Sequence, residues 1–493
     1  MLKRTICLLF LLIINLISFG QMYFDIEGTV NKKISTEFPE GSKVTLNKIK
    51  YDSDAAVTKV YITKDNKSYW IYNTSLKRIT FQANNIKQFW VKQGLENGVY
   101  KNLMNKGMQY KMRKELEEET ITYMKYSKSN NLLFNDSYLE SYLYSLAYKI
   151  YPSKLDDGRP GILNVKVVKD TEPNAFIYPN GTMFISTGLL STINSEDELI
   201  AVMAHEIAHF VLDHAIININ KAEKRKKRAD FWAAVATGAA LATDIYASTQ
   251  NAYYSPGAIT FATATIAFTI ADEFNKRMGL KFSREQEEQA DLCAKNLMKY
   301  IGKDHTSLSS VLAKIKTYNI LNGNYYALTG QGTHPSINKR IKSIGTPKSD
   351  FIDPEYDKTI SFVNSFNAIA QLNNLHLETC SLLVDRNIKA GVATEEDYVM
   401  LAMVTTFMFD NQEKNLEALG YINKAKGLNV YPTINLHKQE ALIFIRLKNY
   451  DKAITSLNTF LKSIAQLKLT DESSILTIEE EWTRKMIFKV SKM

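Results

Sequence analysis

The stretch Ala204-His205-Glu206-Ile207-Ala208-His209 decides how this chain is interpreted. It lies inside an apolar segment that runs from Ser195 to about Ile217, and the residue spacing of that segment predicts a helix. Ser195 is suited to cap the start of the helix, and Glu198, three residues later, would complete a capping box. The quoted residues are therefore read as neighbours on one helix.

His205 and His209 are four residues apart, so a helix projects both imidazoles from the same face. That geometry suits two zinc–nitrogen bonds of about 2.0–2.1 Å. Glu206 would lie beside the metal without binding it, where it could take a proton from a water molecule. The chain has only 7 histidines, so this pattern seldom arises by chance. A pair of buried structural histidines is the alternative reading.

A catalytic zinc ion needs a third protein ligand and an open fourth position. Residues 283–291, Ser-Arg-Glu-Gln-Glu-Glu-Gln-Ala-Asp, offer one, because Glu287 and Asp291 are again four residues apart. One carboxylate could bind the metal while the other accepts a hydrogen bond from the far nitrogen of a ligating histidine. Spacing alone does not choose Glu287 over Glu285 or Glu288, and a solvated acidic helix face is the alternative.

Together these motifs resemble the gluzincin family of HtpX, the CAAX prenyl proteases, and the Oma-type and BepA-type proteases. The resemblance covers about residues 130–345. It rests on the two helical motifs, on Thr333-His334-Pro335-Ser336, and on Asn174-Ala175-Phe176, Pro179-x-Gly181 and Gly188-Leu189-Leu190. It implies Glu287 as the third ligand of one Zn²⁺ per chain and Asp291 as the support of a ligand. It also implies that Asn174, Ala175 and Phe176 form a substrate-binding edge.

Three further residues have open roles. His334 could stabilise the oxyanion, or it could occupy the fourth zinc position as a latch; a histidine at a helix start is the simpler reading. Arg340 could pair with a carboxylate, bind the substrate or lie on the surface. His214 is five residues beyond His209, which favours a supporting or surface position over a ligand.

Composition and the N-terminus set the class of protein. The 493 residues are 45% hydrophobic and 23% charged, as in globular proteins, and the net charge of +9 is too diffuse to predict nucleic acid as a partner. Lys3 and Arg4 precede an apolar run, which predicts a signal peptide cleaved between Gly20 and Gln21 and hence a periplasmic or secreted protein. No run reaches the ~18 apolar residues of a spanning helix, so the exported branch of the family fits best.

The regions around the motifs predict a multidomain α+β chain. Residues 21–99 predict a β-rich module, a small barrel or sandwich, and residues 100–129 a connecting helix. The mainly helical zincin domain with a small sheet follows at 130–349. Residues 350–493 predict an all-α domain, in which a recurrence 35 residues apart (Ala418, Ala453) fits either tetratricopeptide-like repeats or a plain bundle.

The functional prediction is an exported zinc endopeptidase of proteolytic quality control, acting on unfolded or extended polypeptides. The C-terminal domain would bind a protein partner. The apolar residues of 221–271 would rest on a membrane surface, cover the cleft or pack inside. The alternative function is an envelope chaperone or scaffold with a latent or structural zinc site.

Overall fold

The computed structural model describes the chain in fourteen stretches. They are residues 21–52, 57–99, 116–118, 120–121, 124–125, 127–129, 131–151, 155, 163–223, 282–321, 336–347, 351–428, 434–469 and 474–493. The predicted signal peptide, His334, nearly all of the 221–271 segment and most of the predicted connecting helix lie outside these residues. Within them, no helix combines the length and apolar character needed to cross a membrane.

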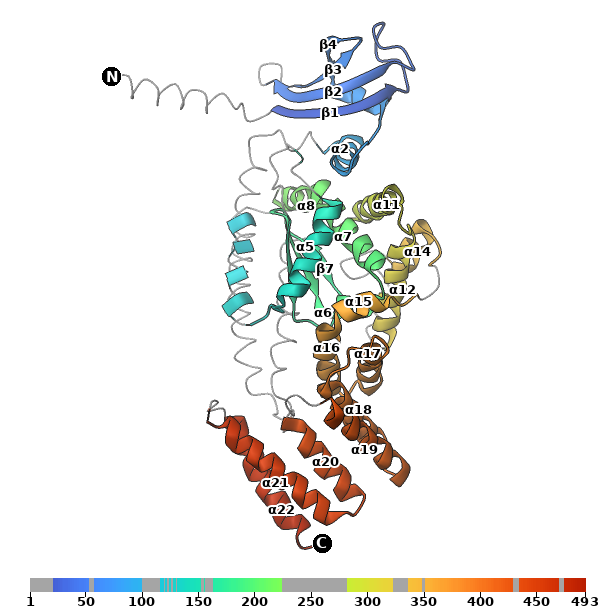
Figure 1. The fold of residues 1–493 in the computed structure, drawn as a ribbon. Coiled ribbons are helices and arrows are strands. Elements are labelled where there is room, and N and C mark those ends of the chain that lie inside the picture. Colours follow the sequence, from blue (N-terminus) through green and yellow to red (C-terminus); the bar gives the residue numbers. More distant parts are fainter. Residues whose placement is uncertain are drawn as a thin grey trace, which may run out of the picture.

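The N-terminal module is one antiparallel sheet in the order β4-β3-β2-β1-β5, drawn in blue in Figure 1. Asp65 and Asn66 join β3 to β4 with positive φ angles of 49° and 61°, as a tight hairpin requires. The sheet keeps two edges, β4 and β5, so the barrel or sandwich expectation is corrected to a single open sheet. Its elements are β1 (Gln21–Val30), β2 (Lys43–Asp52), β3 (Val57–Lys64), β4 (Lys67–Tyr72), a 3₁₀ turn (Asn73–Arg78), β5 (Ile79–Phe81) and α2 (Ile86–Glu96).

The central unit combines helices with a three-stranded sheet in the order β6-β8-β7. Strand β6 is parallel to β8, whereas β7 is antiparallel to β8 and lies at the edge. The turn signal Pro179-Asn180-Gly181 predicts a hairpin between the flanking strands, and the pairing of β7 with β8 confirms it, with Gly181 turning the chain at a φ of 81°. The elements are α5 (Ser137–Ile150), β6 (Asn164–Val168), β7 (Ala175–Ile177), β8 (Thr182–Ser186), α6 (Thr187–Thr192), α7 (Glu196–Val211), α8 (His214–Glu223), α11 (Arg284–Tyr300), α12 (Ser307–Leu321) and α14 (Ile337–Ile344).

Two helix boundaries differ from the sequence prediction. The apolar spacing of residues 132–150 predicts a helix from Leu132, but the helix begins at Ser137, because the Asp136 side chain caps it and Leu133 forms a bridge to Val168. The helix expected to reach Ile217 ends at Val211.

The end of α7 has a local cause. Asp213 has a φ of 61°, a left-handed conformation that Asp tolerates better than most residues. The chain therefore turns before α8 begins at His214. At the other end, the Ser195 side chain caps α7 as predicted, but the Glu198 carboxylate accepts from the backbone of Asn194 instead of completing a capping box.

The region after residue 350 is helical throughout its described residues, and successive helices pack against one another (Figure 1). Ala418 and Ala453, the recurring pair, are both fully buried on α19 and α21. Arg386 of α17 bonds to Asp357 and to the carbonyls of Ser191 and Ile193, which ties this region to the central unit. The helices are α15 (Pro354–Thr359), α16 (Ser361–Asn373), α17 (Leu377–Lys389), α18 (Glu395–Met408), α19 (Gln412–Gly427), α20 (Ile434–Arg446), α21 (Tyr450–Leu467) and α22 (Ser474–Val490).

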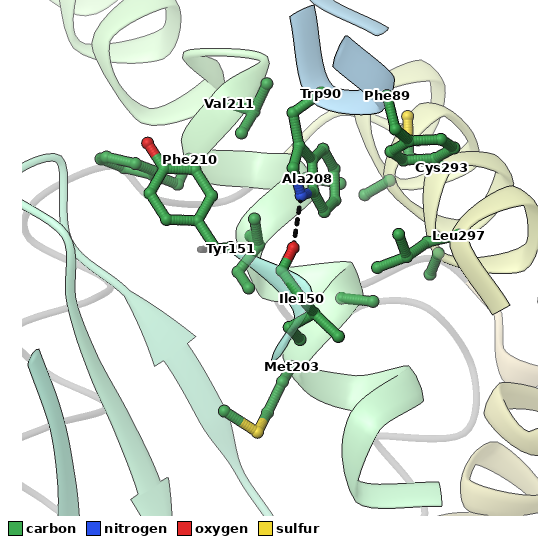
Figure 2. Packing of buried hydrophobic residues seen from close by; sticks show 14 of the residues in the cluster. Phe89, Trp90, Ile150, Tyr151, Met203, Ala208, Phe210, Val211, Cys293 and Leu297 are labelled. Carbon is green, nitrogen blue, oxygen red and sulfur yellow. Dashed lines mark hydrogen bonds between the residues drawn. The ribbon is translucent and has the colours of Figure 1, made fainter. Parts of the chain in front are cut away.

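Helix α2 of the N-terminal module packs into the central unit. Trp90 is completely buried and donates a 2.6 Å hydrogen bond from Nε1 to the carbonyl of Ile150 at the end of α5. Figure 2 shows its ring among side chains of α7 and α11, including Ala208 and Leu297. The sheet, α2 and the histidine-bearing helix α7 thus share one hydrophobic core.

We expect Trp90→Phe to lower the free energy of unfolding by about 2 kcal/mol, because it removes a donor from a buried carbonyl and leaves space in the core. Trp70→Phe makes the same change on a side chain that is 47% exposed, and should cost less than about 0.5 kcal/mol. Urea denaturation of both variants measures the difference. Equal losses would show that α2 does not brace the central unit.

Candidate metal centre

Three helices bring the predicted residues to one point. α7 carries His205, Glu206 and His209, and α11 carries Glu287 and Asp291. The start of α11 is held by a full capping box, in which the side chains of Ser283 and Gln286 each bond to the backbone of the other residue. Arg340 enters from α14. All six of the site residues are at most 7% exposed.

The ring nitrogens of the two histidines and the Glu287 carboxylate enclose one position. His205 Nε2 lies 3.1 Å from His209 Nε2, and the Glu287 oxygens lie 3.6 and 3.8 Å from these two nitrogens. Tetrahedral zinc with bonds of about 2.0–2.1 Å separates its ligand atoms by roughly 3.3 Å. These residues therefore fit a zinc ion in both donor type and spacing, and form the one such cluster among the described residues.

The choice among the glutamates of α11 is explained by helix rotation. Glu287 is completely buried and faces the histidines, whereas Glu285 and Glu288 are exposed. The structure thus places Glu287, the carboxylate that the family resemblance implied, beside the two histidines.

Asp291 and Arg340 form a second layer behind His205. His205 Nδ1 lies 3.0 Å from Asp291 Oδ1, on the side of the ring away from Glu287. Arg340 donates to both Asp291 oxygens, at 2.9 Å from Nε and 2.7 Å from its terminal nitrogen, and its other terminal nitrogen is 3.3 Å from Glu287. Of the roles left open for Arg340, the structure therefore shows the pairing with carboxylates. The guanidinium group is buried inside the site.

These contacts shift the ionisation of the buried groups. Burial raises the pKa of Asp291, but the Arg340 charge and the hydrogen bonds from His205 and Arg340 outweigh it, and its pKa lies below the ordinary value. Burial, followed by repulsion from Glu287, raises the pKa of Glu206 well above 4.5. Despite burial, the neighbouring carboxylates raise the pKa of Arg340.

Strand β7 runs beside Glu206. Interaction with the backbone of Ile177 partly offsets the raised pKa of Glu206, so the carboxylate lies near this strand. Asn174 bonds through its backbone to Ser186, while Ala175 and Phe176 pair with β8, Phe176 stacking on Phe184 at 5.2 Å. The predicted substrate edge is thus the edge strand nearest the site.

Two side chains that contact His209 or His214 were not assigned a role from the sequence. Phe282 stacks on the His209 ring at a centroid distance of 3.9 Å, and Gln289 lies 3.1 Å from His214 Nε2. A Phe just before an acidic helix and a Gln within it carry no distinctive sequence signal. His214, for which a supporting position was one alternative, is buried against His209.

A pair of histidines from one helix, a glutamate from a second and a glutamate next to the first histidine form the arrangement that the resemblance to gluzincin-type metallopeptidases implied. Comparison with known proteins agrees: residues 139–348 match peptidase family M48.

Curated relatives match over the same region. A beta-barrel assembly-enhancing protease of Vibrio cholerae is 30% identical over 180 residues, 36% of this chain and 33% of the relative. The mitochondrial metalloendopeptidase OMA1 of Schizosaccharomyces pombe is 29% identical over 178 residues, 36% of this chain and 44% of the relative. The chain thus spans less than half the length of either relative.

Replacing Arg340 by Ala should lower the free energy of unfolding of the metal-free protein by about 3 kcal/mol, because it leaves two buried carboxylates without their cation. Arg484→Ala is the matched control: Arg484 also donates twice to a carboxylate, that of Glu480, but its side chain is 64% exposed. It should cause no measurable loss. Urea denaturation in the presence of a chelator makes the comparison, and similar losses would contradict the buried-pair account.

Proposed function

We propose that this protein is a zinc-dependent endopeptidase that hydrolyses peptide bonds of unfolded or extended proteins of the cell envelope. The observation that carries the proposal is the convergence of His205, His209 and Glu287 on one position, with Glu206 and the edge strand β7 beside it. The match of the central segment to family M48 supports it.

His205, His209 and Glu287 would hold the metal. A zinc ion there acts as a Lewis acid, which makes a water molecule easier to deprotonate and polarises the scissile carbonyl. The Glu206 carboxylate accepts the proton of the attacking water and passes it to the nitrogen of the leaving amine. Its position on α7 near Ile177 of β7 supports this role, because both the water and the scissile bond must come within hydrogen-bond reach.

The substrate would add as a further strand along β7. Such pairing uses main-chain hydrogen bonds, so it demands an extended chain more than a particular sequence. A hollow beside His209, lined among others by Ile177, Phe210 and Phe282, would receive an apolar side chain. Folded substrates do not offer a free strand, which favours unfolded polypeptides and a role in quality control.

We also propose that the protein is exported to a periplasmic or secreted location and that residues 221–271 contact a membrane. Both proposals are based on the sequence. The C-terminal helices, joined to the central unit through Arg386, would present partners or substrates to the site. His334, as an oxyanion group or a zinc latch, would act from just before α14.

Glu206→Gln should leave zinc binding intact and reduce cleavage of an unfolded model protein by at least about 10²-fold, because the general base is lost. Glu287→Gln should lose zinc and activity together. Glu288→Gln, the exposed neighbour, should lose neither. Metal content and cleavage are measured side by side on residues 21–493.

Several results would change the account. Full activity of Glu206→Gln would remove it as the base. Cleavage seen only after His334→Ala would assign His334 as the latch. Bound zinc with no cleavage in any form, His334→Ala included, would favour the chaperone or scaffold function.

A further inference from the structure

We propose that His214 and Gln289 position His209 for metal binding through a relay of two neutral hydrogen bonds. His214 Nδ1 lies 3.0 Å from His209 Nδ1, and His214 Nε2 lies 3.1 Å from Gln289 Oε1. The His214 side chain is buried, with the residue only 1% exposed. Its backbone is held too, because Gln286 donates to the His214 carbonyl at 3.3 Å.

The directions of both hydrogen bonds follow from the position of the metal. His209 Nε2 faces His205 Nε2 and Glu287, so it is the nitrogen that would bind the ion and must carry no proton. The proton of the neutral ring then lies on Nδ1, which donates to Nδ1 of His214. His214 must in turn be protonated on Nε2, which donates to the amide oxygen of Gln289. Each neutral ring then has one N–H donor and one acceptor nitrogen. His209 Nε2 faces the metal position, and the other three ring nitrogens take part in the two hydrogen bonds.

The turn at the end of α7 makes this contact possible. Five residues along an uninterrupted helix would place the side chain of residue 214 about 140° around the axis from that of His209. The left-handed Asp213 ends the helix and returns His214 against His209. The early end of α7, which the sequence pattern did not predict, therefore has a use at the site.

His214 and Phe282 restrain the ring of His209 in different ways. The stacked Phe282 ring, at an interplanar angle of 26°, limits tilting of the imidazole plane. Stacking does not determine which ring edge faces the metal. The in-plane hydrogen bond to His214 does, because it fixes Nδ1 on the side away from His205.

The two metal-binding histidines thus have unlike supports. His205 is backed by the carboxylate of Asp291, which is itself paired with Arg340. His209 is backed by a neutral imidazole and a neutral amide. Because a charged acceptor makes a stronger hydrogen bond than a neutral one, loss of Asp291 should weaken zinc binding more than loss of His214.

The test compares zinc affinity in variants at His214, and it rests on the proposed metal site. His214→Leu removes the acceptor and should weaken zinc binding 10- to 100-fold, the usual effect of losing such a partner. His214→Asn can place its side-chain oxygen near the position of ring Nδ1, and should recover most of that loss. Gln289→Leu should give a smaller loss than His214→Leu, and Gln289→Glu should give none. Affinity is measured by competition with a chromophoric chelator.

Two further readouts separate positioning from packing. In the Co²⁺-loaded protein, the d–d absorption bands should shift in His214→Leu and return in His214→Asn, because they report the orientation of the ligands. His376 is the matched control: its Nδ1 lies 2.7 Å from Gln371 Oε1 in the C-terminal region, so His376→Leu breaks a His–Gln contact away from the site. It should change neither affinity nor spectrum.

If His214→Leu and His214→Asn lost zinc affinity equally, or if neither lost any, the relay would be overturned. The proposed metal site would still hold, provided that the wild-type protein binds zinc. A wild-type protein that binds no zinc would overturn both the relay and the proposed function.

Discussion

The buried charge at the meeting point of α7, α11 and α14 is the constraint on which the rest of the structure depends. Glu206, Glu287 and Asp291 are nearly excluded from water; the Arg340 guanidinium pairs with Glu287 and Asp291, and its charge also opposes the rise in the pKa of Glu206. Isolated carboxylates at such depth cost far more than a typical protein's stability. A divalent cation between His205, His209 and Glu287 would offset the remaining charge, and metal binding would then be coupled to folding of the centre.

Both flanking regions hold the helices that carry this charge. On one side, Trp90 of α2 lies against α7 and α11, in the core that also includes the N-terminal sheet (Figure 2). On the other, Arg386 and Asn367 bond to the end of α6, the helix that directly precedes α7. The flanking regions therefore support the helices that carry the site.

Much of the site could be predicted from sequence because helical periodicity is a local property. The spacing of His205 and His209 placed them on one face, and the structure has them 3.1 Å apart. The choice of Glu287 over Glu285 and Glu288 needed the family resemblance, since rotation of α11 against α7 is a tertiary property. The end of α7 at Val211 was missed because Leu212 and Ile216 continue the apolar pattern, while the left-handed conformation of Asp213 carries no pattern. The relay to Gln289 joins residues 75 positions apart and is visible only in the fold.

X-ray absorption at the zinc edge tests the central claim most directly. The account predicts one zinc ion per chain in purified residues 21–493, with a first shell of nitrogen and oxygen atoms at about 2.0–2.2 Å and the scattering pattern of two imidazoles. A metal content far below one per chain, or sulfur scattering at about 2.3 Å, would contradict it.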